Sequence, residues 1–324
     1  MTTLSHYPLV SIILPVYNQD LNFIKSALLS VEKQSYQNYE IILSDDGDSL
    51  LDMLEGEFPE FLERKNICVL KNPGSKGIFS NINYALQYVS GEFIQLFSQD
   101  DVMLETFIHD QMGPMLKYPD VAMVFCSFDV IDEKGVLLTK GINYTYNQQD
   151  DKLILSADSH SLFLKYGCLP GNISPVMLRK NALQVIGPFN QDLPYAGDFE
   201  YWVRLSERYD IYYRQKTGLK VRQHKAQASQ TITNRQLLQD ITSVYNNLIE
   251  MIPYEERNVE VRNINRRVGV AFMHDTISGI LKGQKPLSDL KVRIKDMRQF
   301  PFHPFLSLYY YIMSIPGRLL RKFS

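Results

Sequence analysis

The sequence predicts an α/β protein with a mainly parallel sheet flanked by helices. Short β-branched runs alternate with longer helical patterns through the first 130 residues, the arrangement that builds such a sheet. The runs are apolar along their length, as expected of strands buried on both faces. Hydrophobic residues make up 45% and charged residues 22% of the 324 residues, so disorder, collagen and coiled coil are excluded as the main architecture.

Five strands are expected in this first region, at Val10–Val16, Tyr39–Ser44, Ile67–Leu70, Phe93–Phe97 and Val121–Cys126. Helical patterns fill the gaps between them. One begins near Leu21, another begins near Ser49, and a third runs from Ile78 to Val89, before a Ser-Gly pair. The predicted order is therefore βαβαβαβ.

The pattern is less regular further along the chain. Five more elements are expected there: a hairpin tip at Asp132–Gly135, a loop at Asn143–Asp151, a strand at Gly171–Met177, and helices at Lys180–Val185 and Asp198–Tyr209. From Asn234 onward the pattern is largely helical, with breaks at prolines. We therefore predict two domains, residues 1–230 with the sheet and residues 231–324 with helices alone.

Charge and cysteine content exclude several classes of protein. The 34 Lys and Arg residues nearly balance the 36 Asp and Glu residues, so the chain lacks the positive field of a protein that binds nucleic acid through phosphates. Cys68, Cys126 and Cys168 form no C-x-x-C pair, which argues against a disulfide framework and favours a reducing cytosol. The N-terminus lacks the pattern of a signal peptide, and no apolar stretch reaches the length of about 18 residues that a membrane-spanning helix needs.

Two acidic clusters follow runs that are expected to be parallel strands. The second strand ends in Asp45 and Asp46, and the fourth ends in Asp100 and Asp101. Ligands of an open parallel sheet bind beyond the carboxyl ends of its strands, so both clusters are expected at one ligand-binding edge. Carboxylates there suit a divalent cation such as Mg²⁺ or Mn²⁺ together with substrate phosphates, or the N–H of a nucleobase. The alternative for either cluster alone is ordinary turn chemistry after a strand.

Several segments in a fixed order resemble the inverting family 2 glycosyltransferases. They are Val10–Asn18, Tyr39–Asp48, Gly77–Asn83, Gly91–Asp101, Gly171–Met177, Ile186–Asn190, Gly197–Leu205 and Val221–His224. Order and spacing agree from about residue 8 to about residue 230. The resemblance implies the GT-A nucleotide-diphospho-sugar transferase fold for this region, followed by a helical C-terminal extension.

The resemblance also implies a site for a nucleotide-sugar donor and a metal. Donor contacts are expected from eight residues: Pro15, Tyr17, Asn18, Asp45, Asp46, Lys76, Asn83 and Asp100. Asp101 is the expected ligand of Mn²⁺ or Mg²⁺, and His224 is expected to join either the metal or the diphosphate. The family usually has an acid where this chain has Ser98, so the metal is expected to depend on Asp100, Asp101 and the diphosphate.

Asp198 matches the position of the family's catalytic base, with Glu200 as the reserve candidate. A base is needed to take the proton of the acceptor hydroxyl, while a metal neutralises the leaving diphosphate. Without the flanking motifs, Asp198 would be interpreted as an acid favoured by the helix dipole at a helix start. Trp202 follows one helical turn later. Its indole is expected either to line the sugar pocket or to pack in the core.

The last part of the chain is strongly basic. From Lys282 to the C-terminus there are nine basic and two acidic residues, a balance of +7, and the segment 300–315 between these charges is rich in aromatic residues. This composition is typical of a segment that lies on an anionic membrane surface. A helix that packs on the first domain or on a second subunit, as in a homodimer, is the alternative.

We therefore expect an inverting glycosyltransferase that takes its sugar from a nucleotide donor, most simply a UDP-sugar. The acceptor is expected to be a glycan or a lipid-linked glycan in cell-surface polysaccharide or lipopolysaccharide biosynthesis, with the enzyme in the cytoplasm or peripheral at the inner face of the membrane. Two alternatives stay open. One is an inactive nucleotide-binding module of the same fold, and the other is a nucleotidyltransferase, although the basic Gly-rich loop of the latter is absent after the first strand.

Overall fold

The computed structural model describes residues 7–18, 20–47, 54, 56–224, 227, 233–299 and 301–320. Their contacts divide the chain into two compact units. The described residues of 7–160 and 166–227 form the first unit, and residues 161–165 and 233–320 form the second. The division lies beside residue 230, but a short piece of one helix from the first region belongs to the second unit.

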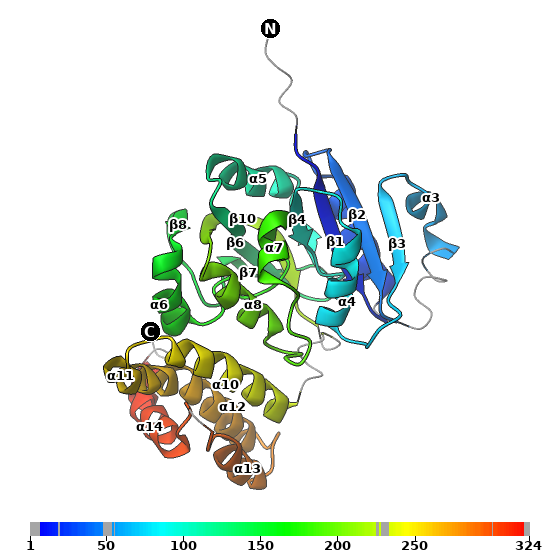
Figure 1. Ribbon diagram of the computed structural model, residues 1–324. Helices are drawn as coiled ribbons and strands as arrows, with labels where there is room; N and C mark the ends of the chain where they lie inside the picture. Colours follow the sequence, from blue (N-terminus) through cyan, green and yellow to red (C-terminus); the bar gives the residue numbers. More distant parts are fainter. Residues whose placement is uncertain are drawn as a thin grey trace. The chain divides into compact units, whose positions relative to one another are not determined.

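The first unit is built around one mixed sheet (Figure 1). Its strands are β1 (Val10–Val16), β2 (Tyr39–Asp45), β3 (Ile67–Lys71), β4 (Phe93–Leu96), β5 (Val102–Met103), β6 (Val121–Ile131), β7 (Leu137–Ile142), β8 (Lys152–Ile154), β9 (Val176–Arg179) and β10 (Asp210–Arg222). They follow the order β3-β2-β1-β4-β9-β6-β10-β5, with β7 paired to β6 and β8 paired to β10.

Parallel pairing places the predicted acidic clusters at one edge. β1 pairs in parallel with β2 on one side, where Val10 faces Tyr39, and with β4 on the other, where Val10 faces Phe93. The carboxyl ends of β2 and β4 therefore flank the carboxyl end of β1. β9 interrupts the parallel pattern because it runs antiparallel between β4 and β6. The predicted α/β fold is confirmed in this mixed form.

Helices flank the sheet (Figure 1). Before the second unit's own helices begin, they are α1 (Leu21–Glu32), α3 (Pro59–Leu62), α4 (Ile78–Ala85), the 3₁₀ turn η1 (Leu86–Tyr88), α5 (Phe107–Lys117), α6 (Ser156–Tyr166), α7 (Lys180–Ile186) and α8 (Gly197–Ser206). Residues 161–165 of α6 are the piece that belongs to the second unit. The helix that we expected near Ser49 begins outside the described residues. The strand that we expected from Gly171 begins only at Val176, because the side chain of Asn172 accepts the backbone N–H of Ser174 and forms a turn.

Two glycines position the helices that border the ligand edge. Gly77 precedes α4 with φ at 141°, a conformation that other residues rarely adopt. Gly197 opens α8 where a Cβ atom would lie 2.7 Å from the ring of Phe79 on α4. Because no side chain intervenes, the start of α8 packs directly against the start of α4.

The second unit contains helices α10 (Asn234–Glu250), α11 (Tyr254–Ile264), the π-helical turn η2 (Asn265–Gly269), α12 (Val270–Leu281), α13 (Ser288–Asp296) and α14 (Pro304–Leu320). The buried side chain of Asn265 ties them together. It donates to the carbonyls of Val261 and Pro301 and accepts from the backbone N–H of His303 and the hydroxyl of Ser307. Among the described helices, none is both long and apolar enough to cross a membrane.

Candidate active site

Asp45 and Asp46, at the end of β2, are both buried and both held by neighbouring groups. Asp45 accepts the backbone N–H of Gly47 at 2.7 Å and pairs with Lys71 Nζ at 2.9 Å. Asp46 accepts the side-chain amide of Asn72 at 2.9 Å and the backbone N–H of Gly77 at 2.7 Å. The two residues that we expected to contact the donor therefore differ in what they bind. Asp46 anchors the start of α4, and Asp45 pairs with the ammonium of Lys71.

Lys71 is a candidate site residue that sequence reasoning missed. It ends β3, beside Asp45 in the sheet register, and its ammonium also contacts the carbonyl of Gly47. A basic residue at the end of the strand next to an acidic cluster is the signal that points to it. The ion pair lies half in solvent, because the Lys71 side chain is 48% exposed.

The loop after β1 is fastened to the loop after β4. The side chain of Gln99 accepts the backbone N–H of Tyr17 at 2.9 Å and donates to the Tyr17 carbonyl at 3.1 Å. Pro15 is buried within β1, whereas the ring of Tyr17 and Asn18 are exposed at the edge. Asn18 has a positive φ of 31°, which Asn tolerates better than most residues. The loop after β1, predicted to contact the nucleoside, and the loop after β4, predicted to bind the metal, are therefore held together by hydrogen bonds.

Asp100 and His224 meet at the end of β4. Nε2 of His224 lies 2.8 Å from Oδ2 of Asp100, and both residues are buried. The other carboxylate oxygen of Asp100 accepts the hydroxyl of Ser98 at 2.5 Å. Ser98 thus supports Asp100 in the position where an additional acid was expected.

Asp101 binds a different set of groups. One of its oxygens accepts the hydroxyl of Ser174 at 2.5 Å, and the other accepts the backbone N–H of Arg222 at 2.9 Å. Burial, followed by the nearby charge of Asp100, raises the pKa of Asp101 well above its usual range. The structure therefore places Asp101, the expected metal ligand, where it links the turn after β4 to the segment before β9 and to the end of β10, and leaves Asp100 facing His224.

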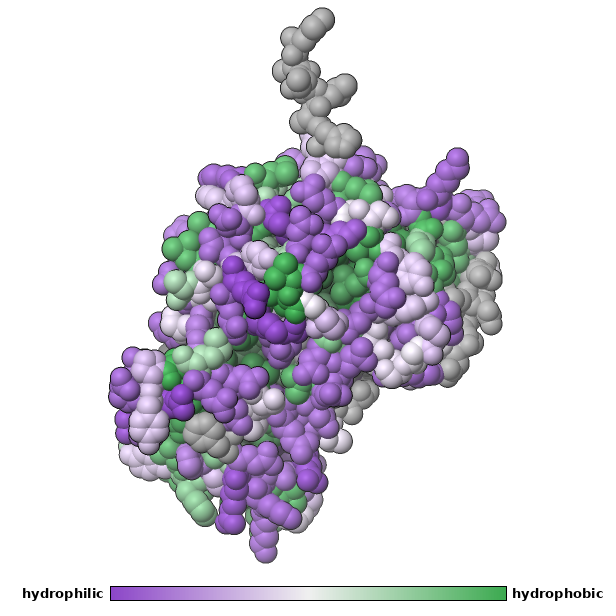
Figure 2. All heavy atoms as spheres, viewed as in Figure 1, coloured by the Kyte–Doolittle hydropathy of each residue, from purple (hydrophilic) through white to green (hydrophobic). Residues whose placement is uncertain are grey.

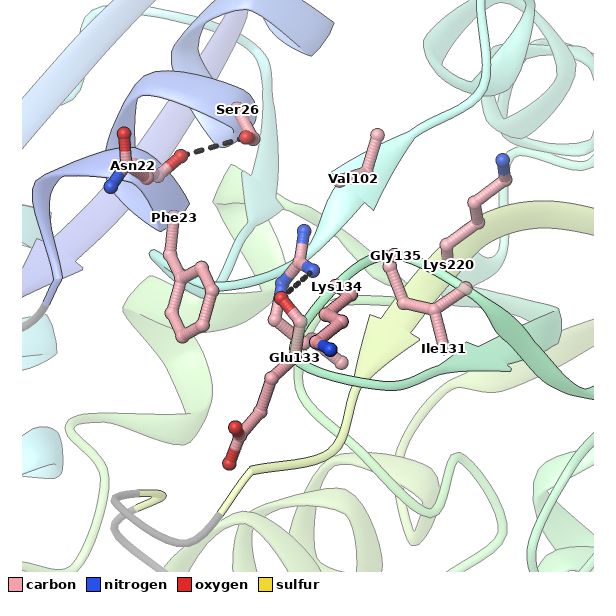
Figure 3. Close-up of a pocket in the computed structure, with 10 residues that line it drawn as sticks. Asn22, Phe23, Ser26, Val102, Ile131, Glu133, Lys134, Gly135 and Lys220 are labelled. Atoms are coloured by element: carbon pink, nitrogen blue, oxygen red, sulfur yellow. Dashed lines mark hydrogen bonds between the residues drawn. The ribbon is translucent and has the colours of Figure 1, made fainter.

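Arg222 connects the elements around this pair. Its guanidinium donates to the carbonyls of Asp100, Asp132 and Glu133, and lies 4.6 Å from the ring centre of Phe23. A cavity of about 380 Å³ lies beside it, and none of the predicted site residues lines this cavity. Figure 3 shows Phe23, on α1, facing the turn that contains Glu133 across this space.

Asp198 is the second residue of α8, and its side chain is half-buried. Burial raises the pKa of Asp198 to about 6, although the backbone N–H of Phe199, at 2.7 Å, lowers it in part. The contact between Gly197 and Phe79 places α8 against α4, whose first turn is anchored to Asp46. Asp198 therefore lies on the side of the fold where both acidic strand ends emerge.

Three further predicted residues have structural partners. Glu200 forms a two-point ion pair with Arg204 at 2.8 and 3.0 Å. Trp202 is fully buried and packs edge-on against Phe189, so core packing describes its surroundings. The side chain of Asn83 bonds both the N–H and the carbonyl of Phe189 at 2.9 Å. Lys76 is exposed in the loop before α4.

Asp100 and His224 suit a divalent cation that also binds the substrate. Carboxylate oxygen and imidazole nitrogen are ordinary ligands of Mn²⁺, and Mg²⁺ takes one or two carboxylates with substrate phosphates. No cluster of three or more His, Cys, Asp or Glu side chains suited to a metal occurs within the described residues. The donor set therefore fits a cation shared with a diphosphate better than an all-protein cage.

A family model described as Glycosyl transferase family 2 matches residues 11–177. This match runs from the second residue of β1 to the second residue of β9 and includes both acidic strand ends, but it stops before Asp198 and His224. A protein from Rickettsia prowazekii (strain Madrid E), described as uncharacterized glycosyltransferase RP339, is 29% identical over 252 residues, which are 77% of this chain and 74% of that protein.

Two characterised proteins are also similar to the chain. The Escherichia coli protein WfgD, a UDP-Glc:α-D-GlcNAc-diphosphoundecaprenol β-1,3-glucosyltransferase, is 33% identical over 129 residues, which are 40% of this chain and about half (49%) of that protein. The crystal structure of S. aureus TarS 1–349 in complex with UDP-GlcNAc matches with a TM-score of 0.63 at 16% identity, over 89% of this chain and 79% of that chain. At this identity the structural likeness shows a shared fold alone.

Proposed function

Because the chain belongs to glycosyl transferase family 2, we propose that it transfers a sugar from a UDP-sugar to a lipid-linked glycan, with inversion at the anomeric carbon. WfgD, a relative over part of its length, uses UDP-glucose and an acceptor on a polyprenyl diphosphate. TarS, which shares the fold, has been crystallised with UDP-GlcNAc. The product would then enter the assembly of a cell-surface polysaccharide or lipopolysaccharide.

The donor would lie along the edge formed by β1, β2 and β4. Asp45 would accept the N–H of the uracil, with Lys71 beside it as a donor to a base carbonyl. Tyr17 and Asn18, held by Gln99, would border the nucleoside, and Lys76 would approach the phosphates. Asp46 and Asn83 would act by holding the backbone beside this edge.

Asp100 and His224 would hold Mn²⁺ or Mg²⁺ together with the donor diphosphate. The cation would supply Lewis-acid neutralisation of the negative charge that grows on the leaving group. Ser98 would orient Asp100 through its hydroxyl, and Asp101 would orient the segment that carries Arg222 and His224. Ser98 and Asp101 would thus orient the two metal ligands, Asp100 and His224, which come from distant segments of the chain.

Asp198 would act as the general base on the acceptor hydroxyl. The observation that carries this proposal is its place at the start of α8, which packs against the start of α4 beside the acidic end of β2, and its raised pKa supports the role. A base is most effective when its pKa lies near the working pH, and a carboxyl with a pKa of about 6 is ionised at neutral pH while remaining a better proton acceptor than an ordinary Asp. Removal of the proton would make the acceptor oxygen nucleophilic as it attacks the anomeric carbon. Glu200 is neutralised by Arg204 and is poorly placed for this role.

A donor and acceptor screen tests this function. Purified protein is incubated with UDP-glucose, UDP-GlcNAc or GDP-mannose, with Mn²⁺ and a short polyprenyl-diphosphate sugar, and release of free nucleoside diphosphate is measured. We expect release only with a UDP-sugar and only when acceptor is present, and NMR of the product should show the inverted anomer. A retained configuration, or equal release with the guanosine donor, would contradict the proposal.

A further inference from the structure

The C-terminal helix carries an apolar face that the described residues leave uncovered. Phe305, Tyr309, Ile312 and Met313 are between 54% and 67% exposed, and their spacing places them on one side of α14. We call these four residues the α14 face. The opposite side of the helix, with Ser307 and Tyr311, is buried in the second unit. An apolar face of this extent marks an interaction site more often than an ordinary surface does.

Exposed cations lie on and just after α13, the helix before α14. α13, which contacts α14, exposes Lys291 and Lys295, and Arg298 follows it at the surface. None of these three side chains forms an ion pair with a described residue. Figure 2 shows apolar residues reaching the surface of the second unit at the lower left, where Figure 1 draws α14, next to strongly hydrophilic ones. Apolar and aromatic residues beside a basic helix are the features of an element that lies on an anionic bilayer.

We propose that the α14 face inserts into the headgroup region of an anionic lipid surface, with the cations of α13 at the lipid phosphates. The functional reason for this membrane contact rests on the lipid-linked acceptor proposed above, because an enzyme held on a bilayer most easily reaches an acceptor in the same bilayer. The anchoring combines burial of the α14 face with attraction between positive side chains and negative headgroups. Neither contribution requires the donor or the acceptor to be present.

Charge favours lipid over a second copy of the chain as the occupant. The segment from Lys282 onward carries a balance of +7. A two-fold contact through the α14 face would bring two such segments together, and like charges that face each other across an interface oppose association. An anionic membrane instead attracts the same charges.

Vesicle flotation of the 324-residue chain tests the proposal. Vesicles of phosphatidylcholine alone are compared with vesicles that contain 40% phosphatidylglycerol, each without acceptor, at about 0.05 M and about 0.5 M salt, since screening shortens electrostatic attraction. We expect binding to the anionic vesicles that weakens at high salt, and little binding to phosphatidylcholine. Absence of binding to the anionic vesicles at low salt would overturn the proposal.

Matched variants locate the surface. Lys291→Ala with Lys295→Ala should lower partition onto anionic vesicles by about 25-fold, at about fivefold for each cation, and Ile312→Ser with Met313→Ser should lower it by about tenfold or more. Controls in the first unit are Lys33→Ala with Lys65→Ala, which change two other exposed lysines, and Leu116→Ser with Val185→Ser, which change two other exposed apolar residues. Circular dichroism melting confirms that each variant is folded. Equal losses in the controls would contradict this location.

Two more measurements separate the alternatives. If light scattering shows a dimer that Ile312→Ser with Met313→Ser converts to a monomer, and anionic vesicles bind none of the proteins, the α14 face joins two copies and the lipid proposal is wrong. Nucleotide release with a short water-soluble acceptor should be the same in the α14 variants and the parent. If vesicle binding holds while no lipid-linked acceptor is glycosylated, the proposed acceptor is wrong and the docking surface stands.

Discussion

Nε2 of His224 lies 2.8 Å from Oδ2 of Asp100, although 124 residues separate the two in the sequence. The contact exists because β10 ends beside the loop after β4, where Arg222 donates to the carbonyl of Asp100 and its backbone N–H binds Asp101. The two neighbouring acids therefore have different partners. Asp101 binds Ser174 and the backbone of Arg222, and Asp100 faces the imidazole of His224.

Asp100→Asn and Asp101→Asn should therefore separate metal binding from stability. Calorimetry with UDP should show that Mn²⁺ increases the affinity of the parent protein, and that this increase falls by about tenfold or more in Asp100→Asn, because an amide carries no charge. In Asp101→Asn the increase should largely persist, while the free energy of unfolding falls by about 1–3 kcal/mol, since the amide keeps one acceptor oxygen and leaves the other of the two buried donors, the Ser174 hydroxyl or the Arg222 N–H, without its acceptor. The reverse pattern would return the metal to Asp101, as the sequence suggests.

Asp198→Asn should leave UDP affinity nearly intact and lower the transfer rate by about a hundredfold or more, which is the usual contribution of a general base. In the parent protein, kcat/KM should rise as the pH passes through about 6, where the carboxyl with its raised pKa ionises, and should level off once the ionisation is complete. That acidic limb should disappear in Asp198→Asn. Transfer at close to the parent rate would remove Asp198 from the mechanism.

The stability of Asp198→Asn provides a second readout. The folded pKa of about 6 lies above the ordinary value of 3.8, so protonation of Asp198 favours the folded state. This stabilisation is fully present below about pH 4 and is lost as the pH rises through about 6. At pH 8 the neutral Asn should therefore give a melting temperature equal to or above that of the parent, and a large decrease would mean that α8 has been disturbed.

Asp45→Ala should raise the dissociation constant of UDP by about fivefold or more, because one net hydrogen bond of about 1 kcal/mol is lost and Lys71 loses its partner. Pyrophosphate with Mn²⁺ lacks the base and should bind the variant and the parent equally. If UDP affinity stays within about twofold while the fold is intact, Asp45 does not contact the uracil. Equal losses for UDP and pyrophosphate would mean that the whole donor edge has shifted.

Glu200→Gln should lower stability modestly and leave the transfer rate near that of the parent. Its partner Arg204 also donates to the carbonyls of Ile186 and Pro188, so loss of the half-buried ion pair should cost about 1 kcal/mol by thermal unfolding. A hundredfold loss of rate with unchanged donor binding would instead make Glu200 the base.

The sequence by itself determined the α/β fold and the edge where the acidic strand ends meet. Both follow from local patterns. A short run that is apolar along its length, such as Val10–Val16, is typical of a strand buried on both faces. Parallel pairing of such strands then brings Asp45 and Asp100 to one edge of the sheet. Tertiary structure decided what each side chain does there. Whether Asp100 or Asp101 faces His224, whether Glu200 is free or paired, and which strand places Lys71 beside Asp45 all depend on contacts between residues far apart in the chain. Residue spacing cannot predict such contacts, because the direction and the desolvation of a side chain are decided only when distant segments pack together.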